Sequence, residues 1–364
     1  MRGALRGTSG RDGPGSVHGG DAGRDERDAG GNARRIRGRR TPMREGSAPI
    51  AELVAALRAA GGQGVVAVVA YGSHVISAAP GRHSAYDLVV VVDSYRHFYA
   101  ALRARGHPGR NSVALAMVSR VLAPTVIAFW PAAPHGPLAK CAVVSRAHFA
   151  RELGRRRRDH FCLGRMMQQV SVVHTRDEEA AAWVDATVAG GRELVPDWTL
   201  PFLDAPFSVE AFCRRILEVS YAGEIRPEQR SRVGTVYDAQ AEFLRDTYTP
   251  ILDARVADGV LEASDGSYRF LVHPSRLVRL RWKAYFALSK ARATARWLKH
   301  MMTFDNWFAY IVRKVERRTG MAVEITPMER RLPFPLLLPK ALRVLRSRDS
   351  AARTPPGPGE DGSR

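Results

Sequence analysis

The chain has 364 residues, 45% of them hydrophobic, and carries a formal net charge of +20. This length accommodates two ordinary domains, and the hydrophobic fraction is normal for a packed globular protein. No apolar run approaches the roughly 18 residues that a membrane-spanning helix needs. The three cysteines include no Cys-x-x-Cys pair, which excludes a disulfide framework and a thiolate zinc site. The charge predicts an acidic partner, either nucleic acid, a phospholipid surface or a phosphorylated substrate.

Both ends of the chain have compositions that predict disorder. Residues 1–46 are rich in Gly, Arg and Asp, and the tail 349–364 carries Pro and Gly without an apolar pattern. The acidic residues within 1–46 argue against a transit peptide, and the lack of an apolar h-region argues against secretion. Met43 lies just before the first periodic segment, so we expect it to be a second candidate start of translation.

Residues 47–200 are predicted to form a first domain of mixed helices and strands. Apolar spacing and β-branched runs predict helices over 50–60 and 95–105, and strands over 65–70, 87–93, 125–130 and 140–145. Such a mixture predicts an α/β or α+β domain.

Residues 201–275 are predicted to form a second, mostly helical domain. Apolar periodicity predicts helices over 209–221 and 236–248. Residues 259–272 predict a hairpin that turns at Asp265 and Gly266, because Asp-Gly favours a tight two-residue turn. Helices followed by such a hairpin indicate a winged-helix-like unit.

Residues 276–348 are predicted to form a basic C-terminal helical region. Residues 276–320 contain twelve Lys or Arg against two acidic residues, and a long helix is expected to run to about residue 318. At 100° per residue its basic side chains fall on two nearly opposite faces. They are Arg276, Arg279, Lys283 and Lys290 on one face, and Arg281, Arg292, Arg296 and Lys299 on the other.

Because charge occurs on both sides, this helix does not have the pattern of a simple amphipathic membrane helix. One face is available for substrate phosphates and the other for anionic lipid. A second lipid-facing candidate is the segment 333–348, in which Leu336, Leu337 and Leu338 are followed by two more leucines among the basic residues Lys340, Arg343 and Arg346.

A glycine turn and an aspartate mark the candidate site. A nucleoside triphosphate is held by backbone N–H groups at a tight turn, and its metal needs a carboxylate on a rigid neighbouring strand. Gly72 and Ser73 follow the first predicted strand, and Asp87 opens the next strand after thirteen intervening residues. This is the arrangement of the polymerase-β-like nucleotidyltransferase fold. It assigns Gly72 and Ser73 to the triphosphate and Asp87 to Mg²⁺ or another divalent metal.

The usual second carboxylate, two residues after the first, is replaced here by Val89. Asp93 lies six residues beyond Asp87, which is about 20 Å along a strand. Two metals in such a site are only about 3.5–4 Å apart. We therefore expect Asp93 to cap the following helix and not to share the metal.

Further short motifs follow this turn in a fixed order. They are residues 140–145, Leu163-Gly164-Arg165, Pro206-Phe207-Ser208, residues 220–226, and Lys299, Thr303, Tyr310 and Lys314. In this order and spacing, over roughly residues 65–318, the chain resembles the mitochondrial translocator assembly and maintenance protein family, the peripheral CDP-diacylglycerol synthases. The expected fold class is then α+β, with a polymerase-β-like nucleotidyltransferase domain, a winged-helix-like domain and the basic helical region.

The resemblance implies a phosphatidate cytidylyltransferase, which converts CTP and phosphatidic acid into CDP-diacylglycerol and pyrophosphate with a divalent metal. It implies that Lys140 neutralises phosphate charge and that Arg165 and Arg226 are further phosphate partners. Glu224 stands where the family usually has Asp, and it is the candidate second metal ligand. Because phosphatidate already carries an anionic oxygen, the enzyme mainly screens charge and aligns the groups for in-line attack.

Two other functions remain open from the residues alone. One is a nucleotidyltransferase that acts on RNA or on a protein side chain, and the other is a non-catalytic basic nucleic-acid-binding protein. The basic run 155–158, expected on a solvated helix face, has no interleaved aromatic residues to favour RNA. The Ala, Arg, Gly and Val bias is typical of a GC-rich bacterial genome. The leading expectation is therefore a cytoplasmic enzyme, peripheral on the anionic inner face of the cell membrane.

Overall fold

The computed structural model of the chain describes residues 48–77, 84–107, 111–131, 137–222 and 232–303. The predictions for residues 1–46, Met43, the segment 333–348 and the tail 349–364 lie outside these ranges. So do Tyr310, Lys314 and the two candidate site residues Glu224 and Arg226.

A mixed sheet of five strands forms the centre of the first domain, in the order β3-β4-β2-β1-β5. The strands are β1 (Val65–Tyr71), β2 (Tyr86–Val92), β3 (Thr125–Phe129), β4 (Ala139–Ser145) and β5 (Ser171–Thr175). β2 and β4 run parallel, and the other neighbouring pairs are antiparallel. The four predicted strands are confirmed within a residue at each end. The sequence pattern does not predict β5, because its sequence SVVHT is short and mostly half-buried, so it lacks a strong apolar signal.

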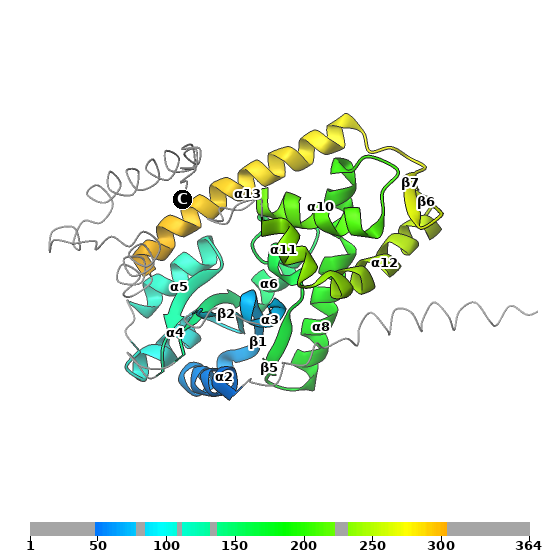
Figure 1. The fold of residues 1–364 in the computed structure, drawn as a ribbon. Coiled ribbons are helices and arrows are strands. Elements are labelled where there is room, and N and C mark those ends of the chain that lie inside the picture. The colour runs from blue at the N-terminus through cyan, green and yellow to red at the C-terminus, as the bar shows by residue number, and fades with distance from the viewer. Residues whose placement is uncertain (1–47, 78–83, 108–110, 132–136, 223–231, 304–364) are drawn as a thin grey trace, which may run out of the picture.

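Helices cover both faces of this sheet (Figure 1). One face is covered by α2 (Ala48–Gly61), α4 (Tyr95–Ala104) and α5 (Ser112–Val121), and the other by α6 (Arg146–Leu153), α7 (Leu163–Met166) and α8 (Glu178–Glu193). Side chains alternate along a strand, so Leu88 and Val90 pack towards the first group while Val89 and Val91 pack towards the second. Burial on both faces explains why the central strands are continuous apolar runs.

Two short helical segments flank β1, and two more connect α8 to the second domain. η1 (Gly62–Gly64) precedes β1, α3 (Ser73–Ile76) follows it, and α9 (Val195–Thr199) with η2 (Leu200–Phe202) follows α8. The second domain contains α10 (Val209–Ala222), α11 (Arg232–Asp238), α12 (Ala241–Ala257) and the hairpin β6 (Leu261–Ser264)–β7 (Ser267–Phe270). The hairpin prediction is confirmed, and its turn residues Asp265 and Gly266 have φ values of 50° and 74°.

The predicted single helix over 236–248 is wrong, because the chain leaves the helical conformation at Gln240 (φ −139°, ψ 22°). The buried Gln240 side chain bonds to the segment before β5 instead: its Oε1 accepts from the Gln169 N–H at 3.0 Å, and its Nε2 lies 3.2 Å from Gln168 Oε1. These long-range contacts separate α11 from α12, and nothing in the local apolar period indicates them.

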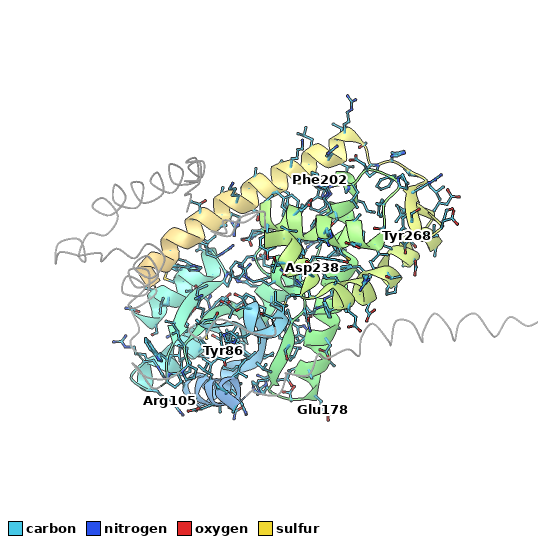
Figure 2. All side chains as sticks on the ribbon, in the orientation of Figure 1. Tyr86, Arg105, Glu178, Phe202, Asp238 and Tyr268 are labelled. Carbon is cyan, nitrogen blue, oxygen red and sulfur yellow. The ribbon has the colours of Figure 1, made fainter. Side chains whose placement is uncertain are left out.

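The basic helix α13 (Arg276–Thr303) extends along the molecule from near the β6–β7 hairpin towards α5 (Figure 1). Trp282, Tyr285 and Phe286 on its inward side pack into the core of the second domain. Phe202, labelled in Figure 2, lies under the helix with its ring 6.3 Å from that of Phe286. Within the described ranges, none of the helices combines the length and the apolar character needed to span a bilayer.

The second basic face predicted for this helix is mostly turned into the protein, which corrects the expectation that it is free for phosphates or lipid. Arg296 is only 2% exposed and pairs with the Asp159 carboxylate, whose Oδ2 also lies 3.3 Å from Arg292 Nε. The Lys299 ammonium donates to the carbonyl of Leu122 and, at 2.8 Å, to that of Pro124. Burial, with the nearby Arg296 charge, lowers the pKa of Lys299 to about 7. These residues follow the same side of the helix as its inward-facing aromatic rings, so they lie towards the interior with them.

Replacement of Asp159 by Ala is expected to destabilise the protein by about 3–5 kcal/mol, because it leaves the buried Arg296 cation without its carboxylate. The free energy of unfolding in urea measures this loss. Asp238→Ala is the matched control, since Asp238 is exposed and pairs with Arg214 at 3.3 Å on the surface, where such pairs contribute little. Equal stabilities of the two variants would show that the Asp159 cluster does not hold α13 in place.

Candidate active site

Three polar side chains lie next to one another across the end of the sheet. Tyr71 is the register partner of Asp87 on β2, and Asp87 is the partner of Lys140 on β4. All three have the strand parity of the residues that pack beneath α6, α7 and α8, so their side chains emerge on that face. Lys140 Nζ lies 3.8 Å from Asp87 Oδ1, and each side chain is 29% exposed. The structure therefore places a carboxylate and an ammonium group side by side where both can reach a ligand.

The Gly72 turn lies directly against this carboxylate. Gly72 has φ 79° and ψ −157°, a conformation that is essentially restricted to glycine. A Cβ added at Gly72 would lie 3.0 Å from Asp87 Oδ2. The Gly72 carbonyl accepts hydrogen bonds from the N–H groups of Val75 and Ile76 and so starts α3. The turn thus brings its backbone to the metal-binding candidate, which agrees with the reason for expecting glycine here.

Ser73 and His74 attach α3 to Ser84, in the segment just before β2. The Ser73 hydroxyl lies 3.2 Å from the Ser84 hydroxyl, and His74 Nε2 lies 2.9 Å from the Ser84 carbonyl oxygen. The His74 ring also stacks on Tyr86 with the centroids 4.0 Å apart. These contacts fix the Gly72 turn relative to Asp87, which lies one residue after Tyr86.

Arg165 approaches the same row from α7. Its guanidinium lies 5.4 Å from the centre of the Tyr71 ring and 3.5 Å from that of Phe161, and Nη1 donates to the Phe161 carbonyl at 2.7 Å. Arg296 of α13 lies 4.8 Å from the Phe161 ring, which is therefore in contact with two guanidinium groups. Arg165 is thus a positioned cation beside Tyr71.

Tyr71 connects the charged groups of the site. Burial raises the pKa of its phenol, Arg165 opposes this rise through its charge and a hydrogen bond, and Asp87 adds to it. The phenol accordingly stays protonated at neutral pH and can donate or accept a hydrogen bond. The sequence motifs assign no role to Tyr71, although its parity with Val69 on β1 is a signal that places it on the same face of the sheet as Asp87. Phe161 and Arg296 give no such local signal.

Two expectations about nearby charged residues are wrong. Asp93 does not cap the following helix: Ser94 does, by accepting from the His97 N–H, while Asp93 pairs with Arg176 at 2.5 Å. The basic run 155–158 does not form a helix face, since it follows the end of α6 in turns. Within this run the Arg157 guanidinium packs 5.1 Å above the Trp282 ring. Tertiary contacts with distant residues explain both differences.

The described residues offer a divalent cation one carboxylate at this site. No group of three or more His, Cys, Asp and Glu side chains suited to a metal occurs in the described ranges. Magnesium, however, is commonly bound through one or two carboxylates together with substrate phosphates and water. A partly exposed Asp87, with Lys140 no nearer than 3.8 Å, fits that mode of binding.

Comparison with known proteins identifies one matching family. The family model described as "Phosphatidate cytidylyltransferase, mitochondrial" matches residues 54–273. The matched region runs from α2 to just beyond β7 and contains Gly72, Asp87, Lys140 and Arg165. The resemblance in the sequence motifs extends to about residue 318, whereas α13 lies beyond the match. No curated protein matches the chain.

Proposed function

Because the chain belongs to the family of mitochondrial phosphatidate cytidylyltransferases, we propose that it transfers the cytidylyl group of CTP to phosphatidate. In this reaction a phosphatidate oxygen attacks the α-phosphorus of CTP. The bond from that phosphorus to the oxygen bridging the β-phosphorus breaks, and pyrophosphate leaves. The products are CDP-diacylglycerol and pyrophosphate.

The observation that carries this proposal is the juxtaposition of Asp87, Lys140 and the Gly72 turn at one end of the sheet. A Cβ placed on Gly72 would lie 3.0 Å from Asp87 Oδ2, so the turn comes close to the carboxylate. Lys140 Nζ lies 3.8 Å from the other carboxylate oxygen. A triphosphate seated on the turn would meet the ammonium group and the carboxylate from one position, and all three residues lie inside the matched region.

Each of these residues has a role that suits nucleotidyl transfer. Gly72 and Ser73 would hold the triphosphate, because a glycine turn lets phosphate approach the backbone. Lys140 would neutralise charge that develops on the pyrophosphate, and Arg165 would bind a further phosphate oxygen. Since phosphatidate is already anionic, no side chain is needed to remove a proton from it. Alignment and charge neutralisation are then the main contributions of the protein.

A divalent cation is part of the proposal, with Asp87 as its protein ligand. Asp87 would hold this ion, and when bound the ion would supply positive charge that reduces the repulsion between the two anionic substrates. The proposal also includes Glu224 as a second metal ligand and Arg226 as a further phosphate partner. Both residues lie outside the described ranges.

The wider setting of the enzyme is proposed on the same basis. A polymerase-β-like nucleotidyltransferase domain is consistent with a mixed sheet that carries a glycine turn and an aspartate on neighbouring strands. Because phosphatidate resides in a bilayer, we propose that the enzyme acts at the anionic inner face of the cell membrane. A site that opens to solvent and a net charge of +20 support contact with such a surface.

The direct test is a product assay with the full-length protein, magnesium, phosphatidate and each labelled nucleoside triphosphate in turn. We expect CDP-diacylglycerol and pyrophosphate from CTP in equal amounts, with much less product from ATP, GTP or UTP. Chelation of the metal by EDTA should abolish turnover. Transfer of a nucleotide to added RNA or protein, with none to phosphatidate, would contradict the proposal.

A further inference from the structure

The guanidinium of Arg165 is held by the ring and the backbone of one neighbouring residue. Its central carbon lies 3.5 Å from the centre of the Phe161 ring, well inside the range of a cation–π contact. Its Nη1 donates to the Phe161 carbonyl at 2.7 Å. The same guanidinium lies 5.4 Å from the centre of the Tyr71 ring, so it is fixed beside the polar row of the active site.

The segment 159–161, which carries this ring, is attached to α13 by buried hydrogen bonds. The Phe161 N–H donates to Asp159 Oδ1 at 3.0 Å, and Asp159 Oδ2 accepts from the Arg296 guanidinium of α13. The N–H of the intervening residue donates to the Ser289 hydroxyl of α13 at 2.9 Å. Asp159, Arg296 and Ser289 are all buried, so water does not compete for these bonds.

Arg296 also contacts the ring directly. Its guanidinium lies 4.8 Å from the centre of the Phe161 ring, and its Nε donates to the Ala123 carbonyl at 3.3 Å. The Phe161 ring thus contacts one arginine of the active site and one arginine of α13. The region that matches the family ends at residue 273, before α13 begins. The link between α13 and the site is therefore seen only in the contacts of this chain.

We propose that α13 positions the Arg165 guanidinium for the triphosphate through Phe161, so that Phe161 and Arg296 are positioning residues of the nucleotide site. This inference rests on the proposed function, because it takes a phosphate of CTP as the ligand of Arg165. A long arginine side chain that is already held in place loses less conformational freedom when it binds phosphate. Without the ring, the ligand itself would have to order the guanidinium.

The test is a double-mutant cycle in the full-length protein, with the affinity for CTP and magnesium measured by isothermal titration calorimetry. Arg165→Ala is expected to weaken binding about 30-fold, because it removes a hydrogen bond from a charged donor. Phe161→Leu keeps an apolar side chain but removes the ring, and it is expected to weaken binding about tenfold. In the Arg165→Ala background it should cause no further loss, since residues that act as a unit are not additive. Phe161→Tyr, which keeps a ring, should recover most of the affinity.

A second variant tests the contribution of α13, and a third is the matched control. Arg296→Lys keeps a cation beside Asp159 but removes the guanidinium from the Phe161 ring, and should weaken CTP binding about threefold. If urea unfolding shows that Phe161→Leu does not fold, Arg296→Lys replaces it in the cycle. Phe202→Leu is the control, because Phe202 is also half-buried and lies 5.7 Å from a guanidinium, that of Arg279, but in the second domain. It should bind CTP like the wild type.

Two results would overturn the positioning role while leaving the proposed function in place. One is wild-type affinity in both Phe161→Leu and Arg296→Lys. The other is an equal loss from Phe161→Leu with and without Arg165, which would show that the ring does not act through the guanidinium. A wild-type protein that does not bind CTP would contradict the proposed function and the positioning role together.

Discussion

Asp87→Asn is expected to lower turnover on CTP and phosphatidate by about 100- to 1,000-fold while leaving the fold intact. The substitution keeps the size and hydrogen-bonding capacity of the side chain but removes the negative charge beside the Gly72 turn. Loss of one electrostatic catalytic group typically costs about 2.7–4 kcal/mol of transition-state stabilisation. Stability should hardly change, because the Asp87–Lys140 pair is partly exposed and its atoms are 3.8 Å apart.

Asp93→Asn is the matched control for this experiment. Asp93 follows the other end of the same strand and pairs with Arg176 on the surface, away from the Gly72 turn. Initial rates measured with phosphatidate in detergent micelles, together with urea unfolding of each variant, separate catalysis from folding. Wild-type turnover in Asp87→Asn, or an equal loss in both variants, would remove Asp87 from the site.

Gly72→Val is expected to weaken CTP binding by at least about 100-fold. The φ of 79° and ψ of −157° at Gly72 lie in a region that a β-branched residue avoids at a cost of order 1–3 kcal/mol. The new Cβ would also lie 3.0 Å from Asp87 Oδ2, so the turn and the carboxylate could not keep their present positions. The added methyl groups would further obstruct the approach of phosphate to the turn. Isothermal titration calorimetry with CTP and magnesium measures the affinity.

A substitution at a second glycine is the control that distinguishes the effect of backbone strain on stability from the loss of the CTP site. Gly106 has a similar φ of 73°, but a Cβ there would have no atom within 4 Å. Gly106→Val should therefore lose stability for the same backbone reason and still bind CTP like the wild type. If Gly72→Val also binds CTP normally, the triphosphate is held elsewhere.

The sequence predicts a residue of the site only where the residues next to it in the chain indicate its position or its role. Gly72 follows a β-branched run and Asp87 opens the next one, so the local pattern alone places both at strand ends. Lys140 is assigned by the family resemblance, and the parallel pairing of β2 with β4 places it opposite Asp87. No local pattern assigns a role to Tyr71, Phe161 or Arg296, since side chains from β1, the segment before α7 and α13 meet only through the fold.

The sequence by itself determined four of the five strands of the central sheet, the glycine turn, the hairpin and the family. Each of these depends on residues close together in the chain: runs of Val, a single Gly, an Asp-Gly pair and short motifs in order. Only the tertiary structure decided which basic side chains are exposed and which are buried. Arg276 and Arg296 are both basic residues of one helix, yet the first is exposed and the second is buried against Asp159. A helical period gives the angle between two side chains but not the direction of the protein interior. That direction is set by packing of Trp282, Tyr285 and Phe286 into the second domain, and it leaves Arg276 and Leu277 on the exposed side of α13.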